Sequence, residues 1–455
     1  RGDLGRTEVP AWGPSLIGPF LGLSGSLVGA VNGELGVGVD IETDDDADEI
    51  TPYYQNWDGN LFFRPLNEDF YALDRVYLED IGGPLNGYLN GLVVRTGSVQ
   101  EVRVDGTIGD IILQDPEGEL VSVTANADRF SPLDTFQGIS GHIFAYNIGD
   151  LDIGDGLLPS DGSPLLSSGI FAMNDIRAIT SGKTSGVVVS GVITALNAVD
   201  NGAFGDIVDG IGSIQLTNGL VKDASIAGEA LDGFWNSFHY DDEQTAQGSI
   251  GNIRLTNTTL FRTRIFTINL DQLQLTGPNG YFDASDLAAT GLVNQISATG
   301  YRNSTLTGTL EEIAVNRIVG ARDVNRITAV QDMADLTIDF TGSVRQSISA
   351  VNISRTSIDV DGELKSLAVT NDLRGSTVNV GSLPSLTAGR NIQSSSIFVS
   401  GNLSTVTAGG RIGNSDIQVT GPGGTIGSIT ARDLISGNIA SAGNIGSITV
   451  TAGDL

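Results

Sequence analysis

The hydrophobic positions of residues 362–455 recur at a nearly constant interval. A glycine opens each of five units, and successive glycines lie 19, 20, 23 and 19 residues apart. Aliphatic residues follow two and five positions after each glycine, and another comes 13 or 14 positions after the first of them. The glycines are Gly362, Gly381, Gly401, Gly424 and Gly443, and the first aliphatic residues are Leu364, Leu383, Leu403, Ile426 and Ile445. A period of about 20 residues is typical of a fold made of stacked repeats.

A polar residue followed by an aliphatic residue marks the middle of each unit. The predicted pairs are Asp372-Leu373, Asn391-Ile392, Arg411-Ile412, Asp433-Leu434 and Asp454-Leu455, with Asp332-Met333 and Asn352-Ile353 upstream. Short polar side chains at turns can hydrogen-bond backbone amides. We therefore expect these polar positions to stack at one corner of the repeat.

Within a unit, apolar residues alternate with small polar ones. Residues 415–419 and 443–450 show this period of two, which indicates a strand. No unit has room for a helix of ten residues or more, and the Leu-x-x-Leu-x-Leu-x-x-Asn signature of a leucine-rich repeat is absent. The pattern predicts an all-β fold, a parallel β-helix (solenoid) with about 20 residues per coil and its aliphatic residues inside.

The repeat divides the chain into three predicted regions. Residues 308–455 carry the regular repeats and have no visible cap at their end, while residues 96–307 keep fragments of the repeat between irregular insertions. Residues 1–95 show no repeat and are expected to form an N-terminal arm and cap that includes an acidic loop. Residues 10–33 carry no charge, but glycines and prolines interrupt them, so we expect no membrane span.

Composition and charge limit the partners of the chain. Its 455 residues include 61 glycines, no cysteine and a net charge of −30, which comes from 24 basic and 54 acidic residues. Phosphate repels such a surface, so nucleic acid is not an expected partner. Without cysteine there are no disulfides and no thiolate chemistry. The charge favours divalent cations and an extracellular or cell-surface location.

Two acidic clusters are candidate calcium sites. Seven of residues 40–49 are carboxylates, and alternating acids such as Asp44, Asp46 and Asp48 can supply the oxygen ligands that Ca²⁺ requires. The second cluster resembles the opening of a calcium-binding loop, although it has one extra residue and lacks the final glutamate; it comprises Asp150, Asp152, Asp155 and Asp161. The alternatives are a solvated acidic loop in the first cluster and an Asp/Gly turn between coils in the second.

An aromatic and acidic segment at residues 234–243 is a candidate glycan site. Flat rings can stack on sugar rings, and paired carboxylates can act as acid and base, which is the chemistry of glycoside cleavage. The candidate residues are Trp235, His239, Tyr240, Asp241 and Asp242. The alternative is that these rings pack on the flank of the solenoid while the acids face water.

The sequence carries no recognisable catalytic motif. Its only histidines are His142 and His239, which leaves little for histidine-dependent triads or zinc sites. The motifs of β-helical polysaccharide-degrading enzymes are absent or in the wrong order: Gly141-His142 precedes Asp241-Asp242, and no Arg-Ile-Lys follows. We therefore expect that the protein is not an enzyme.

The unit Gly-Asn-Ile-Gly-Ser-Ile-Thr-Val-Thr-Ala-Gly-Asp-Leu at residues 443–455 resembles the Gly/Ser/Thr-rich parallel β-helix repeats of large bacterial surface proteins of the surface-layer, filament or adhesin type. The resemblance covers residues 308–455 well and residues 97–307 in patches. It implies export, a scaffold or adhesive role and often bound calcium, and it transfers no catalytic residue.

Two classes of function follow from these patterns. The first is an extracellular structural protein that self-assembles into a surface layer, filament or sheath through its solenoid ends and its N-terminal arm, with calcium bridging the acidic subunits. The alternative is a β-helix that binds or cleaves a cell-surface polysaccharide in the 234–243 loop. The expected partners are accordingly further copies of the chain, in a homo-oligomer or polymer, or a cell-surface polysaccharide.

Overall fold

The computed structural model describes two compact units, Arg1–Ile250 and Gly251–Leu455. Up to residue 94 it describes only the backbone of six strands. Side chains are described, apart from Phe266, in residues 98–104, 107–113, 118–125, 138–158, 169–183, 186–195, 210–226, 248–289, 291–301 and 323–452, and backbone alone at 227, 302 and 316–319. Every regular element assigned in these ranges is a β-strand. The described residues contain no helix that could span a membrane.

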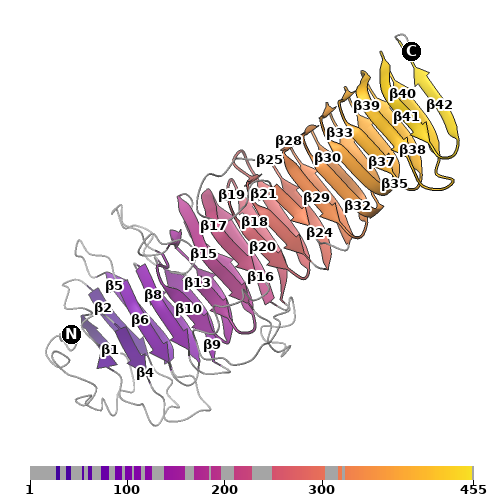
Figure 1. The fold of residues 1–455 in the computed structure, drawn as a ribbon. Helices are drawn as coiled ribbons and strands as arrows, with labels where there is room; N and C mark the ends of the chain where they lie inside the picture. The colour runs from indigo at the N-terminus through magenta and orange to yellow at the C-terminus, as the bar shows by residue number, and fades with distance from the viewer. Residues whose placement is uncertain are drawn as a thin grey trace. The chain divides into compact units, whose positions relative to one another are not determined.

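The first unit consists of two parallel sheets, here called sheet A and sheet B, that receive strands alternately along the chain (Figure 1). Sheet A contains β5 (Leu73–Asp80), β7 (Val99–Val104), β9 (Glu119–Ala125), β11 (Asn147–Asp152), β14 (Ile176–Thr180) and β16 (Gly210–Thr217). Sheet B contains β4 (Asn60–Phe63), β6 (Tyr88–Val94), β8 (Thr107–Leu113), β10 (His142–Ala145), β12 (Gly156–Leu157), β13 (Gly169–Ala172), β15 (Val187–Ala195) and β17 (Gly219–Ala227).

Antiparallel strands precede the parallel ones. β1 (Leu27–Ala30) pairs with β2 (Val37–Glu42), and β2 pairs with β5, both antiparallel. β3 (Tyr54–Gln55) forms an antiparallel pair with β4. Parallel pairing thus begins at β4 and β5, upstream of residue 96.

Most coils of the second unit repeat one arrangement: a strand of sheet A, a short strand of sheet B, a turn and a longer strand of sheet B; in the last two coils the sheet B strands join into one, β39 and β41. Sheet A contains β18 (Ser249–Thr256), β21 (Leu270–Thr276), β24 (Leu292–Ala298), β27 (Asp323–Ala329), β30 (Val344–Ala350), β33 (Ser366–Val369), the second half of β35 (Thr377–Ala388), β38 (Leu403–Ala408), β40 (Ile426–Ala431) and β42 (Ile445–Val450). Sheet B contains β19 (Thr259–Phe261), β20 (Arg264–Thr267), β22 (Tyr281–Asp283), β23 (Asp286–Ala289), β25 (Gly300–Arg302), β26 (Asn316–Val319), β28 (Asp332–Ala334), β29 (Leu336–Phe340), β31 (Asn352–Ser354), β32 (Ser357–Glu363), β34 (Leu373–Arg374), the first half of β35, β36 (Ile392–Gln393), β37 (Ser396–Val399), β39 (Ile412–Val419) and β41 (Ile435–Ser441). Each coil pairs in parallel with the next, so the predicted parallel β-helix is confirmed.

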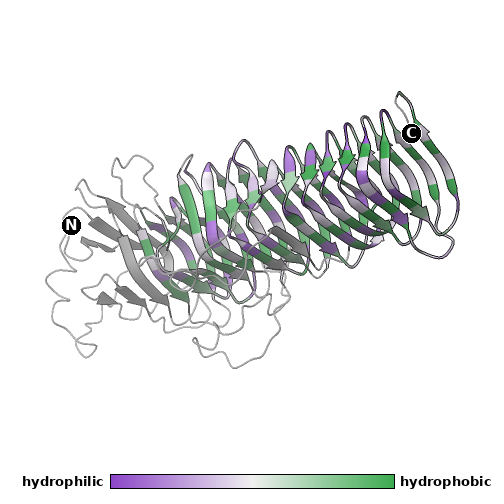
Figure 2. Ribbon diagram, turned by 45° about the horizontal axis from the view of Figure 1, so that its top comes forward, coloured by the Kyte–Doolittle hydropathy of each residue, from purple (hydrophilic) through white to green (hydrophobic). Residues whose placement is uncertain are grey.

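The aliphatic repeat forms the core of the second unit. In sheet A the buried positions follow the pattern buried, exposed, exposed, buried, exposed, buried, as in β38 and β40. Equivalent residues of successive coils pair in register, for example Leu383 with Leu403 and Leu403 with Ile426, and all three are at most 1% exposed. Figure 2 shows the same apolar positions recurring from coil to coil. Each inward side chain therefore packs on its counterparts about 4.8 Å above and below, which gives a continuous apolar column.

The fragments of the repeat in the middle of the chain lie where the pattern places them. The segments that begin at Gly97, Gly212 and Gly248 resemble the first strand of the repeat, and they contribute to β7, β16 and β18. In each of these strands the aliphatic residues are buried.

One predicted core position is wrong. The mid-repeat aliphatic residue of the fourth unit was expected at Leu434, but Ile412 pairs with Ile435, and Leu434 is 40% exposed. The amide of Ile412 donates to the carbonyl of Leu434 at 2.9 Å, just as the amide of Ile392 donates to the carbonyl of Arg411 one coil earlier. Leu434 therefore takes the position of the polar residue Arg411. The inward position keeps its spacing, because Ile435 lies nine residues after Ile426 just as Ile412 lies nine residues after Leu403; the pair Asp433-Leu434 had the right residue types but stands one residue too early.

Candidate functional site

The predicted calcium residues of the first unit bind other groups of the chain. Asp150 on β11 accepts a hydrogen bond of 2.8 Å from Nε of Arg177, and its second oxygen pairs with Nη2 of the same side chain. Oδ1 of Asp152 accepts the amides of Gly154 at 3.1 Å and Gly182 at 2.8 Å.

The third of these residues, Asp155, forms an ion pair with Lys183. In the part of the chain that the structure describes, no three His, Cys, Asp or Glu side chains are grouped to hold a metal ion. Asp161 and the acidic loop with Asp44, Asp46 and Asp48 lie outside the described residues. Calcium binding therefore stays a prediction.

The predicted glycan residues also lie outside the described residues. Trp235, His239, Tyr240, Asp241 and Asp242 all fall in the interval 228–247. The glycan site stays a prediction.

A pair that the motif search did not single out joins β8 to β10. Nδ1 of His142 lies 3.1 Å from Oδ1 of Asp110, and the amide of His142 donates to the same oxygen at 2.8 Å. The ring of His142 also stacks on Phe171 with centroids 6.2 Å apart. Burial raises the pKa of the Asp110 carboxyl, but the hydrogen bonds from His142 outweigh it, so this pKa lies below its ordinary value.

Near this pair the hydroxyl of Ser140 donates to the carbonyl of Ile108 at 3.2 Å. A hydroxyl whose proton is held by a backbone carbonyl is not activated as a nucleophile, which requires a neighbouring base to accept that proton. The contacts of Asp110, His142 and Ser140 therefore link the coil of β8 to the coil of β10.

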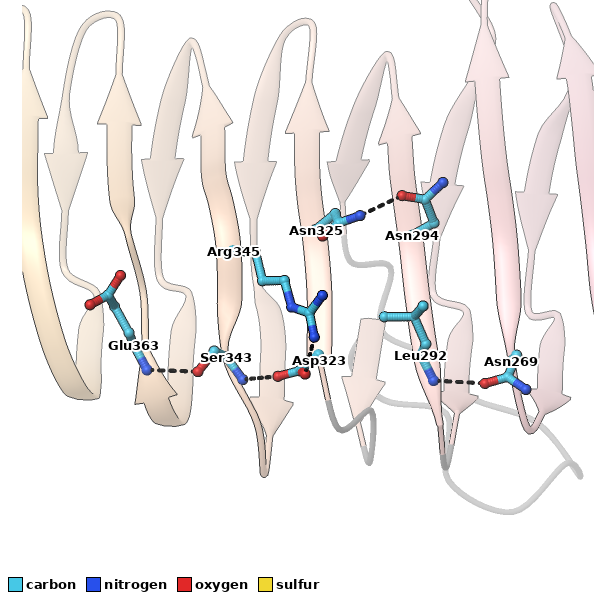
Figure 3. Close-up of polar contacts among 8 residues, drawn as sticks. All are labelled: Asn269, Leu292, Asn294, Asp323, Asn325, Ser343, Arg345 and Glu363. Carbon is cyan, nitrogen blue, oxygen red and sulfur yellow. Dashed lines mark hydrogen bonds and ion pairs between the residues drawn. The ribbon is translucent and has the colours of Figure 1, made fainter.

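Rows of polar side chains that hydrogen-bond from one coil to an adjacent coil are here called polar ladders. The first polar ladder of the second unit lies at the beginning of the sheet A strands (Figure 3). Oδ1 of Asn269 accepts the amide of Leu292 at 2.9 Å, one coil further on. Oδ1 of Asp323 likewise accepts the amide of Ser343 at 2.8 Å, and its other oxygen accepts Nη2 of Arg345 at 2.7 Å. Each bond joins one coil to the next.

The same ladder continues at Ser343, whose Oγ accepts the amide of Glu363 at 3.0 Å. Asparagines form a parallel row on the outer side of sheet A (Figure 3). There Nδ2 of Asn325 donates to Oδ1 of Asn294 at 2.6 Å, and Nδ2 of Asn294 donates to Asp271 at 2.8 Å. The polar side chains of this region thus bind each other along the stacking direction.

A second ladder confirms the predicted polar corner. Oδ1 of Asn352 accepts the amide of Asp372 at 3.2 Å, Oδ1 of Asp372 accepts the amide of Asn391 at 3.1 Å, and Oδ1 of Asn391 accepts the amide of Arg411 at 3.1 Å. Nδ2 of Asn352 also donates to Asp332 at 2.8 Å. Short polar side chains therefore satisfy the turn amides of the following coil, as the sequence predicted.

A third ladder was missed from the sequence. It is a row of buried hydroxyls that follows a left-handed turn residue in each coil: Thr356, Ser376, Ser395 and Ser415. Each of the last three accepts the amide of the preceding member, at 3.2 to 3.3 Å, and each hydroxyl donates to the carbonyl two residues before it. Their spacing of 20, 19 and 20 residues, two positions before a buried aliphatic residue, was the available signal.

The outer face of sheet A carries two rows of hydroxyl groups between residues 385 and 449. The register places Ser385, Thr405, Ser428 and Ser447 in one row and Thr387, Thr407, Thr430 and Thr449 in the other. All eight side chains are half-buried or exposed, and these two rows include no charged residue. This face is therefore neutral and repeats with each coil.

The second unit's ladders consist of structural contacts that link successive coils. No protein-family model, no curated protein and no solved structure matches this chain. Its function must therefore be argued from its own residues.

Proposed function

We propose that the chain is a non-enzymatic structural protein of an extracellular or cell-surface scaffold, in which copies of the β-helix associate into a filament, sheath or layer. The observation that carries the proposal is the direction of the polar contacts. In the second unit the side chains of three ladders bind an adjacent coil, and they do not converge on a common centre within the described residues.

The ladders suit a protein that bears load. Backbone hydrogen bonds between coils and side-chain hydrogen bonds at the corners act along the same axis, so pulling coils apart breaks several bonds together. Amides in the ladders find a partner even though they lie at turns, where an unsatisfied buried amide would cost about 1–3 kcal/mol. A solenoid built in this way resists local opening at its corners.

Charge sets the conditions for association. A net charge of −30 makes copies of the chain repel one another at low ionic strength unless cations lie between them. Calcium bound by the acidic clusters of the first unit would lower this repulsion and support association. The neutral hydroxyl face of sheet A offers a surface through which copies can approach.

Electron microscopy of the purified chain tests this proposal. We expect ordered filaments or sheets with calcium, and their dispersal after a chelator, while magnesium at the same ionic strength serves as the control for simple screening. Dispersed single particles under every condition would contradict self-assembly as the main role. Dispersed particles that bind a neutral or acidic polysaccharide would support the alternative function instead.

A further inference from the structure

Four arginines lie at or beside one corner of the second unit, three where the chain leaves sheet A and one on the short strand β34 of sheet B. They are Arg374, Arg390, Arg411 and Arg432, here called the arginine corner. The amide of Gly410 donates to the carbonyl of Arg390 at 2.6 Å, and the amide of Arg432 donates to the carbonyl of Gly410 at 2.8 Å. The carbonyl of Gly410 also accepts the amide of Asp433 at 3.1 Å, and Ala408 pairs with Ala431, so Arg432 stands one position before the row of Arg390, two coils away or about 10 Å at the usual strand spacing.

The other two arginines fill the space beside this row. Arg411 lies in the intermediate coil, one residue further along, and its Cδ and Nε would lie 3.8 Å from a Cβ at Gly413. Arg374 lies one coil before Arg390, beside Gln393 in the register of sheet B. Four cationic side chains thus share one corner over four successive coils.

These cations differ from Arg345 and Arg355 of the same unit, which form ion pairs. Arg345 and Arg355 are bound by Asp323 and Asp335, at 2.7 and 2.6 Å. Among the residues that the structure describes, the only ion pair of the arginine corner joins Arg432 to Asp433 at 3.6 Å.

The carboxylate of Asp372, which belongs to the polar ladder at this corner, already binds the following coil through one oxygen. Oδ1 of Asp372 accepts both the amide and the Nδ2 group of Asn391. All four arginines are exposed, so their charges are available to a partner.

The distribution of charge identifies that partner. Residues 1–250 contain 38 acidic and 10 basic residues, whereas residues 251–455 contain 16 and 14. The net charges are −28 and −2, so almost the whole negative charge of the chain belongs to the first unit. A nearly neutral second unit with a basic corner is therefore complementary to the first unit of another copy.

We propose that the arginine corner of one copy binds the acidic first unit of a second copy. This inference rests on the proposed self-association and names the surface that performs it. Such a contact joins two different surfaces, so each bound copy still offers its own arginine corner to the next. Heterologous contacts of this kind produce open chains of subunits unless the rotation closes into a ring.

The contact is electrostatic, so its salt dependence and charge dependence can be measured together. The probe is static light scattering of the full chain at a fixed calcium concentration, as a function of protein and NaCl concentration. The test variant is Arg390→Gln/Arg411→Gln, which removes two positive charges from the corner. The matched control is Lys365→Glu, which changes the net charge by the same amount at an exposed position of sheet A.

We expect wild-type association to weaken as NaCl rises, because exposed ion pairs are screened. The double arginine variant should need about a tenfold higher concentration to associate and should depend less on salt. The Lys365→Glu protein should associate at a concentration within about twofold of that of wild type. Its net charge changes by the same amount as in the arginine variant, so the long-range effect of net charge is equal in both, and a larger loss in the arginine variant comes from the corner itself. Circular dichroism and thermal unfolding check that all three proteins are folded.

Two results would overturn the inference while leaving the scaffold proposal intact: equal association of the arginine variant and wild type, or wild-type association that ignores salt. If wild type stays monomeric at every concentration, both proposals fail. If a monomeric wild type binds polygalacturonate and the arginine variant does not, the corner recognises an anionic polysaccharide and the proposal of a second copy is wrong.

Discussion

The buried hydroxyl ladder provides the sharpest test of how the coils are held together. Ser376 is 2% exposed, and its Oγ accepts the amide of Thr356 at 3.2 Å while it donates to the carbonyl of Arg374 at 3.0 Å. In Ser376→Ala the amide of Thr356 loses its partner in a buried place. The carbonyl of Arg374 stays satisfied, because it also accepts the amide of Arg355 at 3.0 Å.

The expected loss follows from this single orphaned donor. A buried amide without a partner costs about 1–3 kcal/mol. The alanine leaves a void of only one oxygen atom, so we expect a total close to 2 kcal/mol. Ser376→Thr should cost much less, since Thr356 fills the equivalent place one coil earlier and its hydroxyl likewise donates to the carbonyl two residues before it.

Hydrogen exchange with mass spectrometry measures the effect where it arises. In a solenoid the loss is felt mainly in adjoining coils, so peptides that span residues 350–380 should exchange about 30-fold faster in Ser376→Ala, the factor that corresponds to 2 kcal/mol. The control is Ser404→Ala, because Ser404 is exposed on β38. If Ser376→Ala and Ser404→Ala exchange at the same rate, or if Ser376→Thr is as damaging as alanine, the ladder does not carry the stability assigned to it.

Three further predictions concern single positions. Tyr301→Phe removes a buried hydroxyl that has no hydrogen-bond partner in the described residues, so it should raise the free energy of unfolding by up to about 1 kcal/mol. Tyr281→Phe breaks a 2.6 Å hydrogen bond to Gln331 and should not raise it. Urea unfolding of the two variants distinguishes these outcomes. The pKa of Asp110 is lowered in the folded state, so its carboxylate stabilises the fold at pH values above its ordinary pKa of about 4, and this stabilisation is lost as the pH falls through the lowered pKa. Asp110→Asn should therefore reduce the dependence of the melting temperature on pH in that acidic range. An unchanged pH profile would contradict the role of His142. Gly437 has φ of +123°, and a Cβ there would meet the carbonyl oxygen of Ser415. Gly437→Ala should therefore lower the free energy of unfolding by about 1–3 kcal/mol or more, measured by thermal unfolding. A variant as stable as wild type would refute this strain.

The fold was predictable because a solenoid repeats its constraints. An inward position needs an aliphatic residue in every coil, so Leu364, Leu383 and Leu403 recur at a fixed spacing, and Asn352, Asp372 and Asn391 recur for the same reason at the corner. The error at Leu434 arose because residue type was followed instead of spacing. Asp433-Leu434 repeats the polar-apolar pair, but Ile435, nine residues after Ile426, occupies the position that Ile412 has nine residues after Leu403.

The functional residues were less predictable for physical reasons. Serine is common at turns, so the buried role of Ser376 and Ser395 was hidden by a composition rich in small polar residues. Clusters of acids looked like metal sites because sequence spacing does not reveal the cations nearby. Asp150 and Asp155 bind Arg177 and Lys183, which lie 27 and 28 residues away in sequence but one coil away in space.

Sedimentation velocity of the full chain over a range of concentrations tests the central claim of self-association most directly. In calcium and low salt the account predicts that species larger than the 47.3 kDa monomer form and grow with concentration, and that they revert to monomer when calcium is removed. A single monomeric species at every concentration, with and without calcium, would contradict it.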